Sequence, residues 1–456
     1  MATTRKNIIV KKKNSVIHLV LIGTKPDIIK QAPLIEELKR AGEYVVVVHS
    51  GQHYSWNLSG GLEEEFGIKP DINLGISGSL YAQQSQIIDR LGTLIADLKE
   101  RGNKVIPYIY GDTTTALAAG IAGFSNLVSS AHVEAGLRTM SPSKELILSL
   151  LHKKFNVARY YESLQASSDW YKGSYEPYPE QFDTRAAAPS AGVHFAPVRL
   201  NADHLVSEGY AKERVFIVGN PVVDAIEIAR KNIKKSKIFD SYPILAKGNI
   251  IRFCIHRREN VSSYHRFTAL YDAMVALVKE GRTVLFISLG ATEKALEAYN
   301  LKKDTIALSK KYANFIYSPV WPYYYDTIAA MQKCSVVATD SGSIQEETVT
   351  LRLPGVVLRF NSDRPESIFQ GSNIIAPPIS SDIVTRIVRE VADNKSLAKS
   401  MKSGAKLYGQ NVSQKMVKIV KQAIKGDTLF NLFDLMEHDR LGLKNHIQWK
   451  KGKTSW

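Results

Sequence analysis

Short apolar runs alternate along the chain with longer segments in which apolar residues recur every three or four positions. The first run covers residues 15–22 (SVIHLVLI), and the apolar residues of 28–38 follow it at helical spacing. A glycine-containing turn at 23–26 separates the two segments. Strands that alternate with helices in this way predict a parallel, doubly wound sheet.

The alternation stops once and then begins again, which predicts two such domains. Gly219-Asn220-Pro221 ends the first series, and a basic helix over 222–237 is predicted to connect the halves. Further strand-like runs of the first half cover 44–49, 105–110, 127–131, 193–196 and 215–218, and those of the second half cover 250–255, 284–289, 315–318, 335–339 and 356–358.

The segment from Met140 to Glu176 interrupts this rhythm with aromatic and charged residues. It is either a helical excursion over a cleft or a peripheral or subunit-contact decoration, because long insertions serve both roles. The predicted plan has a basic disordered arm at 1–14, an N-terminal Rossmann-like domain at 15–221 with the insertion at 140–176, a second such domain at 222–405, and C-terminal helices with a basic tail at 406–456.

Composition narrows the class of protein. The 456 residues are 44% hydrophobic and 23% charged, which is ordinary globular usage. No apolar run reaches the ~18 residues of a membrane span, and the N-terminus lacks the plan of a signal peptide, so a cytoplasmic protein is expected. The two cysteines form no CxxC motif, so neither a disulfide framework nor a zinc site is predicted.

The net charge of +16 favours an anionic partner. Five basic residues lie in the N-terminal arm, and the remaining excess suits a small anion such as a nucleotide diphosphate, through electrostatic steering. Nucleic acid is the alternative partner. We expect none, because the chain has no helix-turn-helix, zinc-finger or RNP-like motif.

Charged side chains follow two of the predicted strands directly. Asp112 comes after the run at 105–110, and His132, Glu134 and Arg138 come after the run at 127–131. The carboxyl ends of strands in an open parallel sheet are where ligands bind, and unpaired buried charge is costly. We therefore predict an active site here; the alternative is a structural carboxylate–arginine pair that holds two loops.

Three further strand ends carry residues suited to phosphate. Lys25 and Lys30 lie at and after the glycine turn that opens the first helix, whose N-terminus attracts anions. The second group, His256 and Arg257, follows the run at 250–255 and offers forked donors.

The third group opens the helix after the run at 335–339. Ser341, Gly342 and Ser343 are small enough for N–H groups to approach a diphosphate, and Glu346 or Glu347 would accept ribose hydroxyls. An ordinary helix N-cap would use the same residues, so this prediction depends on its context. Arg364 follows the next strand and is expected to close the pocket.

Nine short motifs identify a family that the chain resembles. In chain order they are GTKPDIIK (23–30), GQHY (51–54), GDTTTALA (111–118), HVEAGLRT (132–139), FAP (195–197), GNPVVDAI (219–226), HRREN (256–260), DSGSIQEE (340–347) and RPES (364–367). Each motif alone is not specific to one family, but their order resembles that of the non-hydrolysing UDP-N-acetylglucosamine 2-epimerases over residues 16–424.

The resemblance implies an α/β protein of GT-B architecture, with the active site in the cleft between two Rossmann-like domains. It implies an isomerase that inverts C2 of UDP-N-acetylglucosamine (UDP-GlcNAc) without a metal or a cofactor. UDP is eliminated to leave a 2-acetamidoglucal and is added back after C2 is reprotonated from the other face. Family members are commonly homodimers.

The resemblance also implies roles for individual residues. The expected catalytic residues are Asp112, Glu134 and Glu180 for acid–base chemistry, His256 near the diphosphate and C2, and Arg185 after Glu180; the expected residues for substrate and UDP are Lys25, Lys30, His53, Arg257, Ser341, Gly342, Ser343, Glu347 and Arg364.

Several departures from the family pattern indicate a divergent subgroup. Lys25 and Ser343 stand where arginine and glycine are usual, and Arg185 lies one residue later than the family's arginine. The histidine-proline of the second, regulatory UDP-GlcNAc site is replaced within 288–292, which argues against that site, and the insertion at 140–176 is absent from the usual form. The alternatives are a hydrolysing 2-epimerase that releases UDP and ManNAc, a 2-epimerase of a modified UDP-diacetamido sugar or uronate, and a GT-B glycosyltransferase.

Overall fold

The computed structural model describes residues 14–51, 56–403, 406–426 and 429. Residues 1–13 of the expected arm, most of the basic tail and His53 lie outside the described residues. None of the helices in the described segments is long and apolar enough to cross a membrane.

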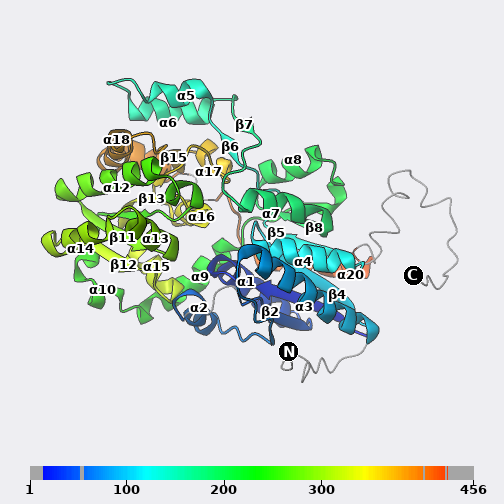
Figure 1. Cartoon of the computed structure of the whole chain (residues 1–456). Coiled ribbons are helices and arrows are strands. Elements are labelled where there is room, and N and C mark those ends of the chain that lie inside the picture. The colour runs from blue at the N-terminus through cyan, green and yellow to red at the C-terminus, as the bar shows by residue number, and fades with distance from the viewer. Residues whose placement is uncertain (1–13, 52–55, 404–405, 427–428, 430–456) are drawn as a thin grey trace.

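Two parallel sheets, one in each half of the chain, form the framework of the molecule (Figure 1). The first sheet has the strand order β3-β2-β1-β4-β5-β8-β9, and the second has the order β12-β11-β10-β13-β14-β15. The alternation of strands and helices predicted from the sequence is therefore confirmed in both halves. The bounds of the first sheet are β1 (Val16–Ile22), β2 (Val45–His49), β3 (Ile72–Asn73), β4 (Lys104–Tyr110), β5 (Ser130–Val133), β8 (Ala191–Ala196) and β9 (Val215–Ile217). Those of the second are β10 (Ile250–Cys254), β11 (Thr283–Ser288), β12 (Phe315–Pro319), β13 (Cys334–Thr339), β14 (Gly355–Val357) and β15 (Asn373–Ile375).

Helices cover both faces of each sheet. In the first half they are α1 (Lys25–Arg40), α2 (Gly61–Glu65), α3 (Leu80–Glu100), α4 (Thr114–Ser125), α7 (Glu180–Ala187) and α8 (Arg199–Ser207). After β9 follow α9 (Val222–Asn232), α10 (Ile238–Ser241), α11 (Arg258–Val261), α12 (Tyr264–Lys279), α13 (Gly290–Ala298), α14 (Lys302–Lys311), α15 (Tyr324–Met331), α16 (Gly342–Leu351), α17 (Pro365–Phe369), α18 (Ser381–Asp393), α19 (Lys395–Met401) and α20 (Val412–Lys425).

The apolar runs are nearly continuous because each central strand is buried on both faces. Successive side chains of a strand point to opposite faces. On β1, Val20 and Ile22 pack with α1 and α20, whereas Ile17 and Leu19 pack with α3 and α4. The first sheet therefore lies between two helical layers, which leaves its strand ends open for a site.

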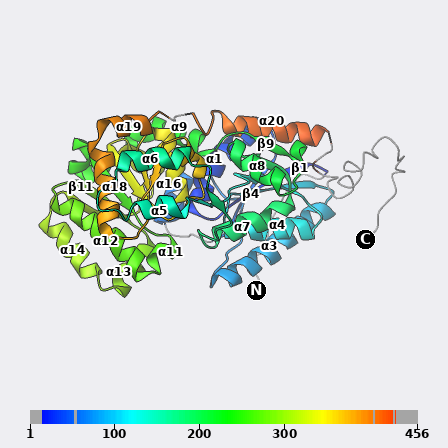
Figure 2. The same ribbon diagram turned by 90° about the horizontal axis from the view of Figure 1, so that it is seen from above.

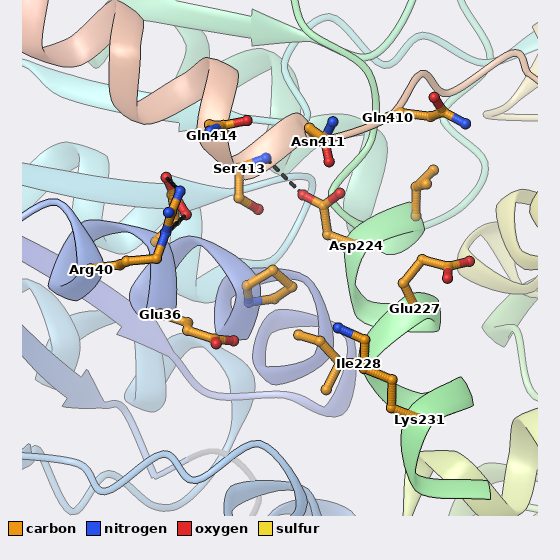
Figure 3. Close-up of a pocket in the computed structure, with 13 residues that line it drawn as sticks. Glu36, Arg40, Asp224, Glu227, Ile228, Lys231, Gln410, Asn411, Ser413 and Gln414 are labelled. Atoms are coloured by element: carbon orange, nitrogen blue, oxygen red, sulfur yellow. Dashed lines mark hydrogen bonds and ion pairs between the residues drawn. The ribbon is translucent and has the colours of Figure 1, made fainter.

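The chain passes between the two halves at two crossings that contact each other. Asn220 donates its N–H to the carbonyl of Tyr408 at 2.9 Å. A Cβ on Gly219, whose φ is +101°, would lie 2.3 Å from that same oxygen, so only glycine fits there. Asp224 of α9 accepts the N–H of Ser413 at 2.8 Å beside a cavity of about 610 Å³ between α1, α9 and α20 (Figure 3). Helix α20 thus packs against the first half, although it follows the second half in sequence.

The insertion forms a small helical layer on the second half of the molecule (Figures 1 and 2). It consists of β6 (Met140–Ser141), α5 (Lys144–Ser149), α6 (Val157–Ala166) and β7 (Tyr171–Lys172). Tyr161 donates to the carbonyl of Gly371 at 2.8 Å, and Trp170 packs edge-on against Phe369 at 4.9 Å.

The predicted plan assigned this insertion to the first domain, but its apolar residues belong to the core cluster of the second half. Tyr160, Tyr161 and Leu164 recur at helical spacing on α6 and must be buried. Helices already cover the first sheet, so this face packs against α17 and α18 instead.

Candidate active site

Charged side chains from both halves meet where the two sheets present their carboxyl ends. Five of them form what we call the carboxylate cluster: Lys30 on α1, Asp112 after β4, Glu134 after β5, Glu346 on α16 and Arg364 before α17. All five are at most 7% exposed. Such burial is tolerated only because opposite charges lie in contact.

Arg364 is the centre of the carboxylate cluster. Its Nε donates to Glu346 at 2.6 Å, and its Nη1 donates to Asp363 at 2.7 Å and to Asp112 at 3.3 Å. Its Nη2 lies 3.6 Å from Glu134. The planar guanidinium, with five N–H donors, contacts four carboxylates at once, which no lysine can do.

Lys30 joins the two halves of the molecule through the same cluster. Its Nζ donates to Glu134 at 2.7 Å and also to Glu346, which lies 316 residues away in the sequence. A cation on the first helix therefore links a strand end of the first sheet to the helix after β13.

The loop after β5 presents Glu134 in an unusual backbone conformation. Glu134 has a φ of +62°, in the left-handed region, which is unfavourable for a residue with a side chain. The cost is offset where surrounding contacts hold the loop, and here Asn220 donates to Glu134 Oε1. A Cβ on Gly136 would lie 2.2 Å from the carbonyl of Asn201, so glycine permits this close packing. Gly111 has no side chain either, and its Cβ position is 3.0 Å from Glu134 Oε2.

The carboxyl groups of the cluster differ in how readily they hold a proton. Burial opposes ionisation of Glu134, but Lys30 and Arg364 outweigh it and lower its pKa to about 2. Burial raises the pKa of Asp112 despite the opposing charge of Arg364. Burial and the charge of Glu134 raise the pKa of Glu346 well above its usual range. Carboxyl groups whose pKa values are pushed apart are suited to acid and base roles at one pH.

Glu180 and Arg185 lie on the same helix but on different sides of it. Glu180, the first residue of α7, forms an ion pair with Arg257 from the second half. Arg185 is exposed, and its expected catalytic role stays a prediction. Five residues along a helix turn the side chain by roughly 140°, away from the direction of Glu180. Thr184, the preceding residue, is fully buried.

His256 is held by Asp340 at the end of β10. Its Nδ1 lies 3.1 Å from Asp340, which also accepts the N–H groups of His256 and Arg257 at 3.0 Å and the side-chain amide of Asn260 at 3.0 Å. Burial alone would lower the pKa of His256, but the charge of Asp340 raises it to about 10. The contact with Asp340 therefore favours the charged form of His256.

A cavity of about 730 Å³, here called the interdomain cavity, lies next to the carboxylate cluster. Its wall includes Leu289, Val320 and Ile344, so most of its surface is apolar. The expected substrate and UDP residues that line it are Lys25, Lys30, His256, Ser341, Ser343 and Glu347.

Two charged residues of this cavity are held by neutral groups. Burial lowers the pKa of Lys25 to about 8, and its Nζ donates to the carbonyl of Trp321 at 2.7 Å. Burial raises the pKa of Glu347, which accepts the hydroxyl of Tyr324 at 3.1 Å. Glu347 lines the cavity, whereas its neighbour Glu346 contacts Lys30 and Arg364. The structure therefore separates two glutamates that the residue pattern alone left as alternatives.

The remaining expected residues lie beside the cavity rather than on its wall. Gly342 packs against the cluster, since a Cβ there would be 2.8 Å from Asp363. Arg257 and Arg364 are engaged in the ion pairs described above. Within the described part of the chain, no three histidine, cysteine, aspartate or glutamate side chains are grouped as metal ligands.

Three buried residues of this region were not among those expected. They are Asn220, which holds Glu134, Asp363, which pairs with Arg359 and Arg364, and Arg252, which lines the interdomain cavity. Arg252 is detectable in the sequence as a charge inside an apolar strand run. The contact of Asn220 with Glu134 joins segments that are distant in the sequence and has no local pattern. The partners of Asp363, by contrast, lie within four residues of it, so a short motif contains all three.

The chain matches a family model described as UDP-N-acetylglucosamine 2-epimerase over residues 36–147 and 172–421. The gap between these ranges falls within the insertion. Among curated proteins, the chain is 27% identical to the UDP-N-acetylglucosamine 2-epimerase of Methanocaldococcus jannaschii, over 78% of this chain and 87% of that protein. It is 28% identical to that of Campylobacter jejuni, over 90% of this chain and 97% of that protein.

Solved structures resemble the fold along nearly its whole length. The Methanocaldococcus jannaschii UDP-GlcNAc 2-epimerase in complex with UDP-GlcNAc and UDP matches with a TM-score of 0.73 and 23% identity, over 89% of this chain and 99% of that one. The Staphylococcus aureus MnaA–UDP co-structure matches with a TM-score of 0.71 and 26% identity, over 91% and 97%. The expected GT-B architecture is thereby confirmed.

Proposed function

The chain belongs to the UDP-N-acetylglucosamine 2-epimerase family, and from this premise we propose that it interconverts UDP-GlcNAc and UDP-N-acetylmannosamine (UDP-ManNAc). The observation that carries the proposal is the position of the carboxylate cluster beside the interdomain cavity, with Lys30 common to both. A glycosyltransferase of the same fold would need a pocket for the acceptor rather than a set of acid–base groups clustered around C2 of one sugar.

The interdomain cavity is proposed to bind UDP. Ser341 and Ser343 at the start of α16 would hold the diphosphate, because unpaired N–H groups and the helix dipole favour an anion there. Lys25 and the cationic His256 would add positive charge. Glu347 would accept ribose hydroxyls, since an ionised carboxylate is only an acceptor.

The carboxylate cluster is proposed to move the C2 proton. That proton is barely acidic, so a base must take it while the bond between C1 and the diphosphate oxygen breaks. The C–H electrons then form the C1=C2 bond of 2-acetamidoglucal, and the electrons of the C1–O bond leave with UDP. Reprotonation of C2 on the other face and addition of the UDP oxygen to C1 complete the inversion.

We assign different steps of this reaction to the carboxyl groups according to their charge. Glu134 is ionised and therefore suited to accept a proton, whereas Asp112, whose pKa is raised by burial, more readily carries one. Glu180, paired with Arg257, would approach from α7. Arg257 and His256 would stabilise the charge that develops on the departing UDP.

One experiment tests this activity. Purified protein is incubated with UDP-GlcNAc in heavy water, and the products are resolved by NMR. We expect UDP-ManNAc with deuterium at C2 and no accumulation of free UDP. Intact substrate without deuterium would refute the proposal, and free UDP with ManNAc would establish the hydrolysing reaction instead. The same assay with UDP-diacetamido sugars tests the substrate class.

We further propose a cytoplasmic homodimer with no nucleic-acid partner. Its domain limits are proposed at 15–221 and 222–405, except that the insertion at 140–176 packs on the second domain. Family resemblance supports the dimer, and the lack of nucleic-acid-binding motifs supports the exclusion. Light scattering of the purified protein measures the assembly, and a monomer at all concentrations would contradict this part of the proposal.

A further inference from the structure

Arg252 is a buried cation on the wall of the interdomain cavity. It lies in the middle of β10, beside Val337 of β13 and Leu285 of β11. Because side chains alternate along a strand, Arg252, Cys254 and His256 fall on the same face, and all three line the cavity. Only 5% of Arg252 is exposed.

The guanidinium of Arg252 lacks the partners that the other buried arginines have. Arg138 pairs with Glu208, Arg359 with Asp363, and Arg364 with several carboxylates. Within the described part of the chain, by contrast, Arg252 Nη1 is shielded from solvent and accepted by no hydrogen-bond partner. A buried charge without a partner is costly, so an arginine in this state is expected to be completed by a ligand.

An unsatisfied acceptor faces the same cavity. Glu347 Oε1 accepts the hydroxyl of Tyr324, but its Oε2 has no hydrogen-bond donor among the described residues. Arg252 and Glu347 line the same cavity, and the charge of Arg252 opposes the effect of burial on the pKa of Glu347. The wall of the cavity therefore includes a donor and an acceptor that have no hydrogen-bond partner among the described residues.

The chemistry of these two groups selects one part of a nucleotide. A phosphate has no hydrogen to donate to Glu347, so a diphosphate alone leaves the acceptor unsatisfied. A nucleoside has hydroxyls that donate to a carboxylate, and nearby oxygens that accept from a guanidinium. The 2′-hydroxyl and the O2 carbonyl of a pyrimidine nucleoside lie on the same edge, as they do in the minor groove of a helix.

We propose that Arg252 is a specificity-determining residue that binds an acceptor oxygen of the nucleoside next to the hydroxyl taken by Glu347. This inference rests on the proposed UDP site but not on the epimerisation chemistry. Arg252 thus distinguishes a nucleotide from its diphosphate alone, and the residues at the start of α16 bind the shared diphosphate.

Calorimetric titrations with UDP and with inorganic pyrophosphate test the proposal. Arg252→Met keeps an unbranched, flexible side chain and removes the donors, and Arg252→Lys keeps the charge. Since a hydrogen bond to a charged group contributes about 1.5–3 kcal/mol, we expect Arg252→Met to weaken UDP roughly 10- to 100-fold and to leave pyrophosphate unchanged. Arg252→Lys should fall between the wild type and Arg252→Met.

A third ligand, 2′-deoxy-UDP, shows which oxygen of the nucleoside accepts the hydrogen bond from Arg252. If Arg252 binds the uracil carbonyl, Arg252→Met loses the same factor for both nucleotides. If it binds the 2′-oxygen, Arg252→Met loses little further affinity for the deoxy nucleotide. Either result supports the proposal.

Two results overturn it: UDP bound equally by the wild type and Arg252→Met, or an equal loss for UDP and pyrophosphate. Should Arg252→Met fail to fold, unchanged UDP affinity of Arg252→Lys has the same consequence, because a lysine cannot reproduce the geometry of the guanidinium. A wild-type protein that does not bind UDP would instead refute the proposed function.

Discussion

The carboxylate cluster and the interdomain cavity differ in how their buried charges are paired. In the cluster, Lys30 and Arg364 contact the surrounding carboxylates directly. In the cavity, Lys25 is held by a carbonyl and Glu347 by a tyrosine hydroxyl, and Arg252 Nη1 finds no acceptor in the described segments. The charges of the cluster are therefore paired within the protein, although Glu134 Oε2 accepts no hydrogen bond from the described residues. For the cavity, we propose that a ligand supplies the missing partners.

This difference suits the two tasks that we propose. Acid–base groups must be held in position before the substrate arrives, because misplacement slows the chemistry. Groups that bind a nucleotide contribute most to affinity when the ligand completes hydrogen bonds that the protein alone does not make. Substitutions in the cluster should accordingly affect turnover and stability, and those in the cavity should affect affinity.

The largest effect is expected in the cluster from Asp112→Asn. The amide cannot exchange a proton with C2, so kcat should fall roughly 10³-fold, within the range that general acid–base catalysis contributes. Affinity for UDP, measured by calorimetry, should change less than about threefold, because Asp112 does not line the cavity. Unchanged turnover would remove Asp112 from the mechanism.

Lys30→Met should be the most damaging of these changes to stability. It leaves Glu134 and Glu346 buried without their shared cation, and breaking a buried ion pair costs roughly 3–5 kcal/mol. Chemical denaturation of the wild type and the variant measures the loss. The matched control is Lys25→Met, whose Nζ contacts only a carbonyl in the described structure; equal losses would contradict the contrast between the two regions.

Glu347→Gln should affect binding far more than stability. Glu347 lines the cavity and its Oε2 has no donor among the described residues, so losing a charged acceptor should weaken UDP binding about tenfold while kcat changes little. The neighbouring Glu346→Gln is its counterpart, with the larger effect on kcat and the smaller one on UDP affinity. An identical pattern for both variants would show that the two glutamates are not separated as described.

The charge of His256 provides a test by pH. Its folded pKa is raised to about 10 from an ordinary 6.5. The associated stability is therefore fully present below about pH 6.5 and is lost as pH rises through about 10. NMR of histidine side chains should find His256 protonated at pH 8, and Asp340→Asn should bring its pKa down. A neutral His256 at pH 7 in the wild type would remove its role with the diphosphate.

The smallest effect is expected outside both regions. Tyr161→Phe removes one hydrogen bond from the insertion to Gly371, which should cost about 1 kcal/mol in unfolding free energy and leave kcat and UDP affinity unchanged. Thermal unfolding and kinetic measurements on this variant serve as the control with which the other variants are compared. A change in kcat would indicate that the insertion acts on the site.

Much of the fold follows from local patterns. The apolar runs and helical spacings predict both doubly wound sheets. A strand buried on two faces is a continuous apolar run, and a helix buried on one face has apolar residues every three or four positions. Asp112, Glu134 and His256 are detectable for a related reason, since each stands directly after such a run. The expected roles of these residues stay predictions until the variants are measured.

Other features have no local pattern. The orientation of α7 leaves Arg185 exposed and Thr184 buried. The spacing of the motif in the sequence does not determine this orientation. The insertion is recognisable as an interruption, but its packing on the second half depends on which surfaces the other helices leave uncovered.

By itself, the sequence determined two doubly wound halves and the strand ends that carry charge, because both depend on residues close together in the chain. Only the tertiary structure decided which charges meet. Lys30 and Glu346 are 316 residues apart and pair because the two halves pack together, while Arg252 and Glu347 line one cavity with a donor and an acceptor left free. Pairing and isolation of buried charge depend on three-dimensional distance, which a linear pattern does not contain.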